Sequence, residues 1–344
     1  MFFFGSFIHL RFNRFAFPST CHISFIVSLP YIISAAYFEE KIVDRLKNIT
    51  VRRSELASPA SSPEKMAKAA ASEADEVVFD LEDGCAPSQK VAARATLIHA
   101  LQTLDFKGKI RAFRANGIQT KFFYRDLIEV VEAAGAYVDA VLLPKADDAA
   151  DVLLADRLLN QIEQNIGLEP GRIRLEIVIE TPKAVLHAEQ IAAASPRVSG
   201  LIFGVLDYSS AMGARGRLRD QYSYYHYPRE KVLAAARAAG VDAIDSVTLQ
   251  IHDSEKCEHD ASISAEMGFD GKWAIHPDQA VIINRVFTPS QEELVRAKEV
   301  LELYDQADVE GGTGVFVYNN EMIDAASLHI ERKKLAIAER MGLI

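Results

Sequence analysis

The sequence contains few of the residues and motifs that mark several common classes of protein. Its three cysteines are far apart and show no CxxC spacing, which argues against a disulfide framework or a zinc cluster and favours a reducing compartment. No GxGxxG or GxxxxGK[ST] motif follows a predicted strand, so the usual phosphate-binding loops are missing. The 48 acidic residues outnumber the 38 basic ones, and the net charge of −10 makes nucleic acid a poor candidate for a partner.

The first 50 residues lack acidic side chains before Glu39 and differ in composition from the rest of the chain. Their apolar run from Ile23 to Phe38 is interrupted by serine and proline, and it is shorter than the roughly 20 residues that span a bilayer, so we expect no stable membrane span. Three interpretations remain open: a targeting presequence, a membrane-associated segment, or a stretch translated upstream of the natural start. The expected location is cytoplasmic, or mitochondrial if this segment is a presequence.

Short β-rich runs alternate with alanine-rich amphipathic stretches from Arg52 onward. The predicted strands are Arg53–Ser58, Glu76–Leu81, Lys109–Arg114, Ala140–Pro144, Arg174–Ile179, Gly200–Val205, Ala243–Leu249 and Gly271–Ile275. The main predicted helices are Pro63–Ser72, Gln89–Leu104, Tyr124–Gly135, Ala149–Ile166, Thr181–Ala194, Pro228–Gly240 and Asp253–Met267. About eight strand–helix units in roughly 250 residues are typical of a (β/α)₈ TIM barrel, whereas a doubly wound sheet has fewer units and usually a glycine-rich phosphate loop.

We divide the chain into an atypical segment at residues 1–50, a TIM barrel at 51–288 and a C-terminal helical extension at 289–344. Within the extension, the sequence predicts a helix at Pro289–Ala307, a glycine turn at Gly311–Gly314, a short strand at Val315–Tyr318 and a last helix at Ala325–Arg340. These elements exceed what a barrel needs. We therefore expect the extension to cover the site of a neighbouring subunit or the mouth of its own barrel.

Polar side chains stand where the predicted strands end. They include Asp80, Glu82, Asp83, Arg114, Lys145, Glu180 and Asp207. Ordinary salt bridges at the barrel rim are one explanation. Charges so close to a core are costly unless they are paired or bind a metal, however, and the carboxyl ends of barrel strands converge on the face where such enzymes place their sites.

Glu180 and Asp207 follow adjacent predicted strands, with no cysteine or histidine pair nearby. Two carboxylates in this setting suit a hard cation, which we expect to be Mg²⁺, with Mn²⁺ as the alternative. Asp80, Glu82 and Asp83 are close enough to one another in sequence to form an outer shell that holds metal-bound waters. Arg114 presents a planar fork of donors that suits a carboxylate or an oxyanion.

An ordered set of motifs runs through the same residues. It comprises Val77–Gly84 with Ala86–Pro87, Arg114–Gly117, Leu143–Lys145, Ile179–Thr181, Phe203–Asp207, Gly271–Pro277 and Gly314–Asp324. Together they resemble the citrate lyase β-subunit / malyl-CoA lyase family, within the HpcH/HpaI aldolase superfamily. The resemblance covers about Arg52 to Arg340.

This resemblance implies a Mg²⁺-dependent TIM barrel, usually a homotrimer or a dimer of trimers, that cleaves or forms 3-hydroxyacyl-CoA thioesters. The products of cleavage would be acetyl- or propionyl-CoA and an acid such as glyoxylate. By position, Glu180 and Asp207 would be the metal ligands and Arg114 would contact the reacting oxygens. Glu180, Glu82 and Asp83 would help Arg114 to bind substrate. Asp324 would match an aspartate that acts as acid or base in a neighbouring subunit's site.

Two positions depart from the family pattern: Ala60 stands where a glycine is common, and Gln250 stands where an aspartate is usual. The exact substrate therefore stays open. The leading hypothesis is a malyl-CoA or β-methylmalyl-CoA lyase, and the alternatives are a citramalyl-CoA lyase or a malyl-CoA thioesterase. A third hypothesis, from another class, is a non-catalytic or partner-dependent subunit like the citrate lyase β-subunit.

Overall fold

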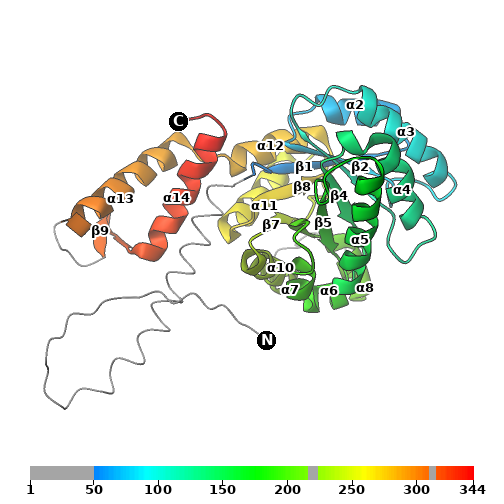
Figure 1. Ribbon diagram of the computed structural model, residues 1–344. Helices are drawn as coiled ribbons and strands as arrows, with labels where there is room; N and C mark the ends of the chain where they lie inside the picture. Colours follow the sequence, from blue (N-terminus) through cyan, green and yellow to red (C-terminus); the bar gives the residue numbers. More distant parts are fainter. Residues whose placement is uncertain (1–49, 216–223, 310–314) are drawn as a thin grey trace, which may run out of the picture. The chain divides into compact units, whose positions relative to one another are not determined.

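A parallel barrel of eight strands forms the centre of this computed structural model, which describes residues 50–215, 224–309 and 315–344. Each strand pairs with the next along the chain, and the last closes the barrel against the first (Figure 1). The strands are β1 (Ser54–Pro59), β2 (Glu76–Asp80), β3 (Ile110–Arg114), β4 (Ala140–Leu143), β5 (Arg174–Ile179), β6 (Val198–Phe203), β7 (Asp242–Asp245) and β8 (Gly271–Ala274). The predicted TIM barrel is confirmed. The predicted glycine turn and residues 1–49 of the atypical segment lie outside the described residues.

Helices follow the strands around the barrel (Figure 1). They are α2 (Pro63–Ala71), α3 (Lys90–Thr103), α4 (Phe123–Ala134), α5 (Ala149–Asn165), α6 (Pro182–Leu186), α7 (Ala188–Ala192), α8 (Val205–Ala211), α10 (His226–Ala239), α11 (Ser254–Met267) and α12 (Pro277–Phe287). Side-chain caps explain where several of them begin. Ser62, Asp148 and Asp253 each accept a hydrogen bond from a backbone N–H in the first turn of the helix that follows.

Two predicted elements differ from the observed ones by more than two residues at an end or by an interruption. The helix predicted at Thr181–Ala194 is divided into α6 and α7, because the backbone of His187 (φ −103°, ψ 10°) leaves the helical region. The strand predicted at Ala243–Leu249 stops at Asp245, because side chains occupy carbonyl groups beyond it: the Lys272 ammonium donates to the carbonyl of Ser246, and a side-chain amide occupies that of Thr248.

The alternation of β5 shows how the sequence builds the barrel. Leu175, Ile177 and Ile179 point outward and belong to the large core between strands and helices. Val178 points inward and packs in the barrel interior with residues of other strands, among them Val78, Ala112, Leu142 and Ile202. Glu176 and Glu180 share this inward phase. The interior therefore ends in a buried carboxylate at both its amino-terminal and carboxyl-terminal sides.

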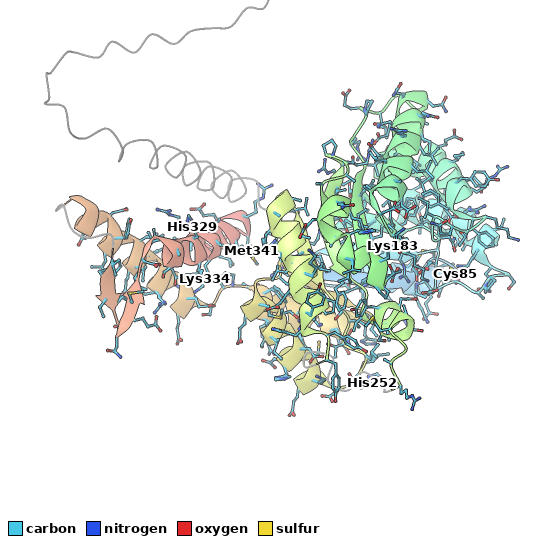
Figure 2. The ribbon with its side chains drawn as sticks, turned by 90° about the horizontal axis from the view of Figure 1, so that it is seen from below. Cys85, Lys183, His252, His329, Lys334 and Met341 are labelled. Atoms are coloured by element: carbon cyan, nitrogen blue, oxygen red, sulfur yellow. The ribbon has the colours of Figure 1, made fainter. Side chains whose placement is uncertain are left out.

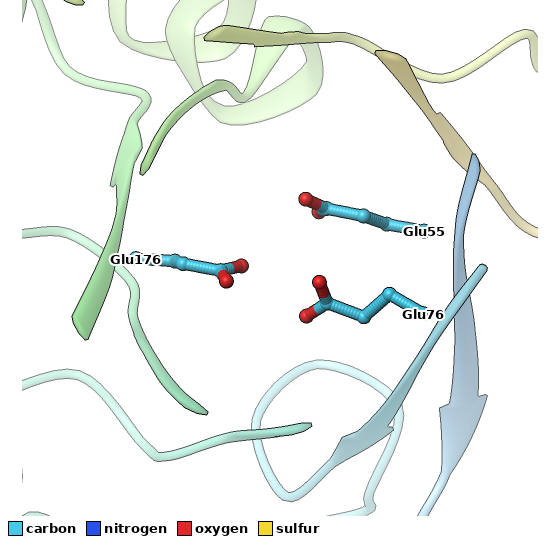
Figure 3. A group of neighbouring side chains, drawn as sticks. All are labelled: Glu55, Glu76 and Glu176. Carbon is cyan, nitrogen blue, oxygen red and sulfur yellow. The ribbon is translucent and has the colours of Figure 1, made fainter. Parts of the chain in front are cut away.

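A carboxylate cluster closes the amino-terminal end of the interior. Glu55, Glu76 and Glu176 are fully buried and point toward one another, and each places an oxygen within 4.8 Å of the others (Figure 3). Arg52 already lies among them, with its Nε 2.9 Å from Glu76 and its Nη2 2.9 Å from Glu176. The spacing would suit a cation, but the arginine supplies the positive charge. Asp242 lies 3.5 Å from the same guanidinium, so the carboxylates still outnumber their counter-charge.

Protons can neutralise this excess. Burial, followed by the charges of the neighbouring glutamates, raises the pKa of Glu55 well above its ordinary value, and burial with the charge of Glu176 does the same to the pKa of Glu76. Arg52 opposes both shifts without cancelling them. The folded protein therefore retains protons here up to a higher pH than an unfolded chain does.

We expect this cluster to lower stability as pH rises above about 4.3, the ordinary pKa of glutamate. Between that pH and the raised pKa, each retained proton reduces the free energy of unfolding by about 1.4 kcal/mol per pH unit, because the native state binds more protons than the unfolded state. In Glu55→Gln, the side chain needs no proton. Urea unfolding from about pH 5 to about pH 8 should show a flatter dependence than in wild type.

The matched control is Glu169→Gln, which removes a charge from an exposed position. It should follow the wild-type pH dependence. Equal slopes for wild type and Glu55→Gln would contradict proton retention by the cluster.

The C-terminal extension pairs two helices with a small hairpin. They are α13 (Gln291–Val309), β9 (Phe316–Tyr318), β10 (Glu321–Ile323) and α14 (Ala325–Arg340). Val300, Ile323 and Leu328 form its apolar centre. Lys334, labelled in Figure 2, joins the helices, since its Nζ lies 3.7 Å from Glu293 of α13. Within the described ranges, no helix is both long and apolar enough to cross a membrane.

Candidate active site

Polar side chains from several strand ends line a cavity of about 610 Å³ at the carboxyl-terminal side of the barrel. They include Asp80, Asp83, Arg114, Glu180 and Asp207. An apolar wall lies alongside them and includes Leu56, Phe203, Leu206, Val247, Leu249, Ile251, Trp273 and Ile275. A cavity of this size, mostly apolar and with a few convergent polar groups, is typical of a small-molecule site.

Arg114, the last residue of β3, is held by Asp80, the last residue of β2. Its Nε and Nη2 donate to the two carboxylate oxygens of Asp80 at 2.8 and 2.7 Å, and the backbone N–H groups of Glu82 and Gly84 donate to the same carboxylate at 2.8 and 2.6 Å. Burial opposes ionisation of Asp80, but Arg114 and these hydrogen bonds hold its pKa below the ordinary value. The guanidinium also lies 5.3 Å from the centre of the Trp273 ring. Its orientation is therefore fixed on several sides.

Glu180 lies directly after β5 and is only 2% exposed. The backbone N–H of Lys145 donates to its Oε1 at 2.8 Å. Gly204 leaves the room that this carboxylate occupies: a Cβ added there would lie 2.5 Å from the Cβ of Glu180 and 2.8 Å from its Oε2. Burial, together with the charges of Asp207 and Glu82, raises the pKa of Glu180 to about 8 despite nearby cations.

Asp207 lies in the first turn of α8 rather than at the end of β6, and its side chain is 38% exposed. It pairs with Lys145, whose Nζ is 3.5 Å from Asp207 Oδ1 and 2.5 Å from Glu82 Oε1. Lys145 follows β4. The segments after β4, β5 and β6 thus bring the acidic group of Glu180 and Asp207 together with Lys145.

The donor set fits a divalent cation. The ionisable groups of the acidic wall are Asp80, Glu82, Asp83, Glu180 and Asp207, against Arg114 and Lys145. When all are charged, the negative groups are in excess. Carboxylate oxygens are the ligands that Mg²⁺ prefers, and a cation on Glu180 would replace the proton that burial favours.

The predicted site residues fall into three groups. Arg114, Glu180, Asp207 and Asp83 line the cavity. Glu82 is buried beside it and pairs with Arg114 Nη1 at 3.2 Å and with Lys145. Asp324 does not line the cavity of its own chain. Their roles in metal binding, substrate binding and catalysis stay predictions.

Asp324 is the N-cap of α14. It accepts hydrogen bonds from the backbone N–H and the hydroxyl of Ser327, both at 2.9 Å, in a capping box. These bonds hold the pKa of Asp324 below its ordinary value within the single chain. A substitution at this position therefore acts on the helix as well as on any catalytic role.

Sequence reasoning missed three features of the site. The sequence shows Lys145 as a charged residue at a strand end and within the Leu143–Lys145 motif, but it does not indicate the contacts of Lys145 with Glu82 and Asp207. Trp273 has no charge that would mark it at a strand end, yet it packs inside the barrel, lines the cavity and contacts Arg114. Gly204 was part of a motif, yet its closeness to Glu180 depends on strand register, which the sequence does not show.

The two departures from the family pattern have local explanations. Ala60 is fully buried, its backbone is outside the left-handed region, and its N–H donates to the carbonyl of Asp80 at 2.9 Å, so no glycine is required there. Gln250 does not line the cavity, whereas its neighbours Leu249 and Ile251 do.

Residues 53–277 match the HpcH/HpaI aldolase/citrate lyase family. An L-malyl-CoA/β-methylmalyl-CoA lyase of Cereibacter sphaeroides is 37% identical over 291 residues, which cover 80% of this chain and 91% of that protein. The citrate lyase β subunit of Haemophilus influenzae is 34% identical over 294 residues, which cover 84% of this chain and 99% of that subunit.

Solved structures agree with these matches. Protein CitE from Mycobacterium tuberculosis, in complex with magnesium, acetoacetate and coenzyme A, is 32% identical, with a TM-score of 0.68 over 84% of this chain and 99% of that one. The barrel and the matches define a carbon–carbon lyase. Within that class, the chain belongs to the HpcH/HpaI aldolase/citrate lyase family.

Proposed function

We propose that this protein uses Mg²⁺ to cleave or form a carbon–carbon bond in a 3-hydroxyacyl-CoA thioester such as malyl-CoA or β-methylmalyl-CoA. Cleavage would yield acetyl- or propionyl-CoA and glyoxylate. The observation that carries the proposal is the acidic group of Glu180 and Asp207 beside the fixed guanidinium of Arg114, in one cavity. The relatives named above support it, since they include a malyl-CoA lyase and a protein with bound magnesium and coenzyme A.

Glu180 and Asp207 would hold Mg²⁺ (or Mn²⁺), which when bound polarises an oxo group as a Lewis acid. Arg114 presents a fixed positive charge to the oxyanion that develops during bond cleavage, and its pairing with Asp80 avoids reorganisation in the transition state. The apolar wall around Phe203 excludes water and strengthens these interactions. Glu82 and Asp83 would assist substrate binding through Arg114 and the cavity surface.

The remaining acid/base group would be Asp324 from a neighbouring subunit. This assignment agrees with the absence of Asp324 from the residues that line the cavity of its own chain. It makes a homotrimer, or a dimer of trimers, the expected assembly. We also propose a cytoplasmic location, with a mitochondrial one as the alternative if the first residues are a presequence.

Malyl-CoA, β-methylmalyl-CoA and citramalyl-CoA, each offered with Mg²⁺, form the test of substrate. We expect glyoxylate and acyl-CoA from the first two and no turnover with excess chelator. Keto acid and CoA products are measured by chromatography.

Each other result would indicate a different function. Free malate with free CoA would indicate a thioesterase, and pyruvate from citramalyl-CoA would indicate a citramalyl-CoA lyase. No turnover of any free thioester by the isolated chain would favour a partner-dependent subunit, as in the citrate lyase β relative.

A further inference from the structure

Lys145 lies among the carboxylates of the proposed metal site. Its Nζ is 2.5 Å from Glu82 Oε1 and 3.5 Å from oxygens of both Asp83 and Asp207. Its backbone N–H donates to Glu180 at 2.8 Å. Main chain and side chain of this residue thus contact different members of the same acidic group.

The backbone of Lys145 is in the left-handed region, with φ of 54°. This conformation is uncommon for a residue with a Cβ, and it is retained where the surroundings determine it, often at functional sites. Here it turns the N–H toward Glu180 while the side chain extends toward Glu82. A glycine would adopt this turn more easily, but it would carry no ammonium.

The Lys145 side chain remains a positively charged ammonium. Partial burial opposes it, but the hydrogen bond and charge of Glu82, followed by the charges of Asp207 and Asp83, raise the pKa of Lys145 above its ordinary value. An ammonium and a divalent cation that approach the same carboxylates repel each other. Because the lysine stem is flexible, the ammonium can yield its place and turn toward another anion.

We propose that Lys145 is a built-in cation that competes with Mg²⁺ for Asp207 and Glu82 and turns toward the carboxylate of the oxo acid when the metal binds. This inference rests on the proposed function. It makes Lys145 a positioning residue that couples two ligands: the metal frees the ammonium, and the anionic acid receives it. Such coupling is reciprocal, so the oxo acid must also strengthen metal binding.

Calorimetric titration with Mg²⁺, without and with glyoxylate, tests the inference directly on the full chain. The Lys145→Met substitution removes the competing charge. Methionine, like lysine, has an unbranched side chain, so the backbone preference at this position changes little. We expect Mg²⁺ alone to bind about tenfold more tightly than in wild type, a modest gain because the ammonium is partly exposed. The strengthening of metal binding by glyoxylate should shrink by a similar factor.

Two variants serve as controls. Lys145→Arg keeps the positive charge and should not gain metal affinity. Lys183→Met removes an exposed lysine that pairs with Asp148 at 2.9 Å outside the cavity, and it should bind Mg²⁺ as wild type does (Figure 2 labels Lys183).

The outcomes distinguish the role of Lys145 from the proposed metal-dependent function. Unchanged or weaker Mg²⁺ binding in Lys145→Met would overturn the role of Lys145 and leave the proposed function standing. No binding of Mg²⁺ or Mn²⁺ by wild type would overturn the proposed metal-dependent function and, with it, this inference. Damage to the fold would weaken Mg²⁺ binding. The tighter binding expected of Lys145→Met therefore cannot result from such damage.

Discussion

Asp207→Asn should lower Mg²⁺-dependent turnover by at least about 100-fold, because loss of an outer-shell partner alone costs up to that much and Asp207 is assigned as a direct ligand. The carboxamide has nearly the same shape but lacks the charge that a hard cation prefers. The fold should persist, since the side chain is 38% exposed and its ion pair with Lys145 is as long as 3.5 Å. Steady-state kinetics with a thioester from the panel, beside thermal unfolding, measures both effects.

Asp105→Asn is the matched control, an exposed aspartate between α3 and β3 whose side-chain oxygen caps a turn that an amide oxygen can also cap. It should retain full activity. Substantial Mg²⁺-dependent turnover by Asp207→Asn would mean that another residue holds the metal.

Mixed oligomers should recover activity from two inactive variants, if Asp324 acts in a neighbouring subunit. Asp324→Asn retains an N-cap acceptor for α14 but cannot exchange a proton, so it separates chemistry from helix stability in a way that alanine would not. Arg114→Lys keeps a charge beside Asp80 but loses the two-pronged contact and should lose about 100-fold in rate. Each variant alone should therefore be nearly inactive.

Refolding or co-expressing the two chains in equal amounts tests the sharing. In a cyclic oligomer with random mixing, about one site in four combines a native Arg114 with a native Asp324 from the next subunit. We expect about a quarter of the wild-type specific activity. A mixture as inactive as its components would place Asp324 in its own chain's chemistry, whereas full activity of Asp324→Asn alone would place it outside catalysis.

The sequence predicts those parts of the fold that local pattern determines. Inward Glu176, Val178 and Glu180 alternate with outward apolar residues, and that period of two defines β5 without any knowledge of its neighbours. The last helix is found at the residues predicted, because Asp324 and Ser327 form a local cap. The clustering of Arg114 and Glu180 follows from barrel closure, since carboxyl ends of parallel strands meet on one face.

Other features depend on contacts between distant residues. β7 is shorter than its apolar pattern suggests, because Lys272 and Gln279 side chains occupy the next carbonyl groups. The position of Lys145 between Glu82 and Asp207 requires three loops to converge, and no local signal describes such convergence. The buried Glu55 is likewise unremarkable in sequence, since its partners lie on other strands.

Two glycines restrict how this site can diversify. A Cβ at Gly84 would lie 2.5 Å from a carboxylate oxygen of Asp80, and one at Gly204 would lie 2.5 Å from Glu180, so the acidic wall has no room for even one added carbon. The apolar wall of the cavity includes Val247, Leu249 and Ile251, in the segment after β7, and none of these side chains is fully buried. New acyl preferences are therefore expected to evolve, or to be selected from libraries, on the apolar wall, while the acidic residues are retained.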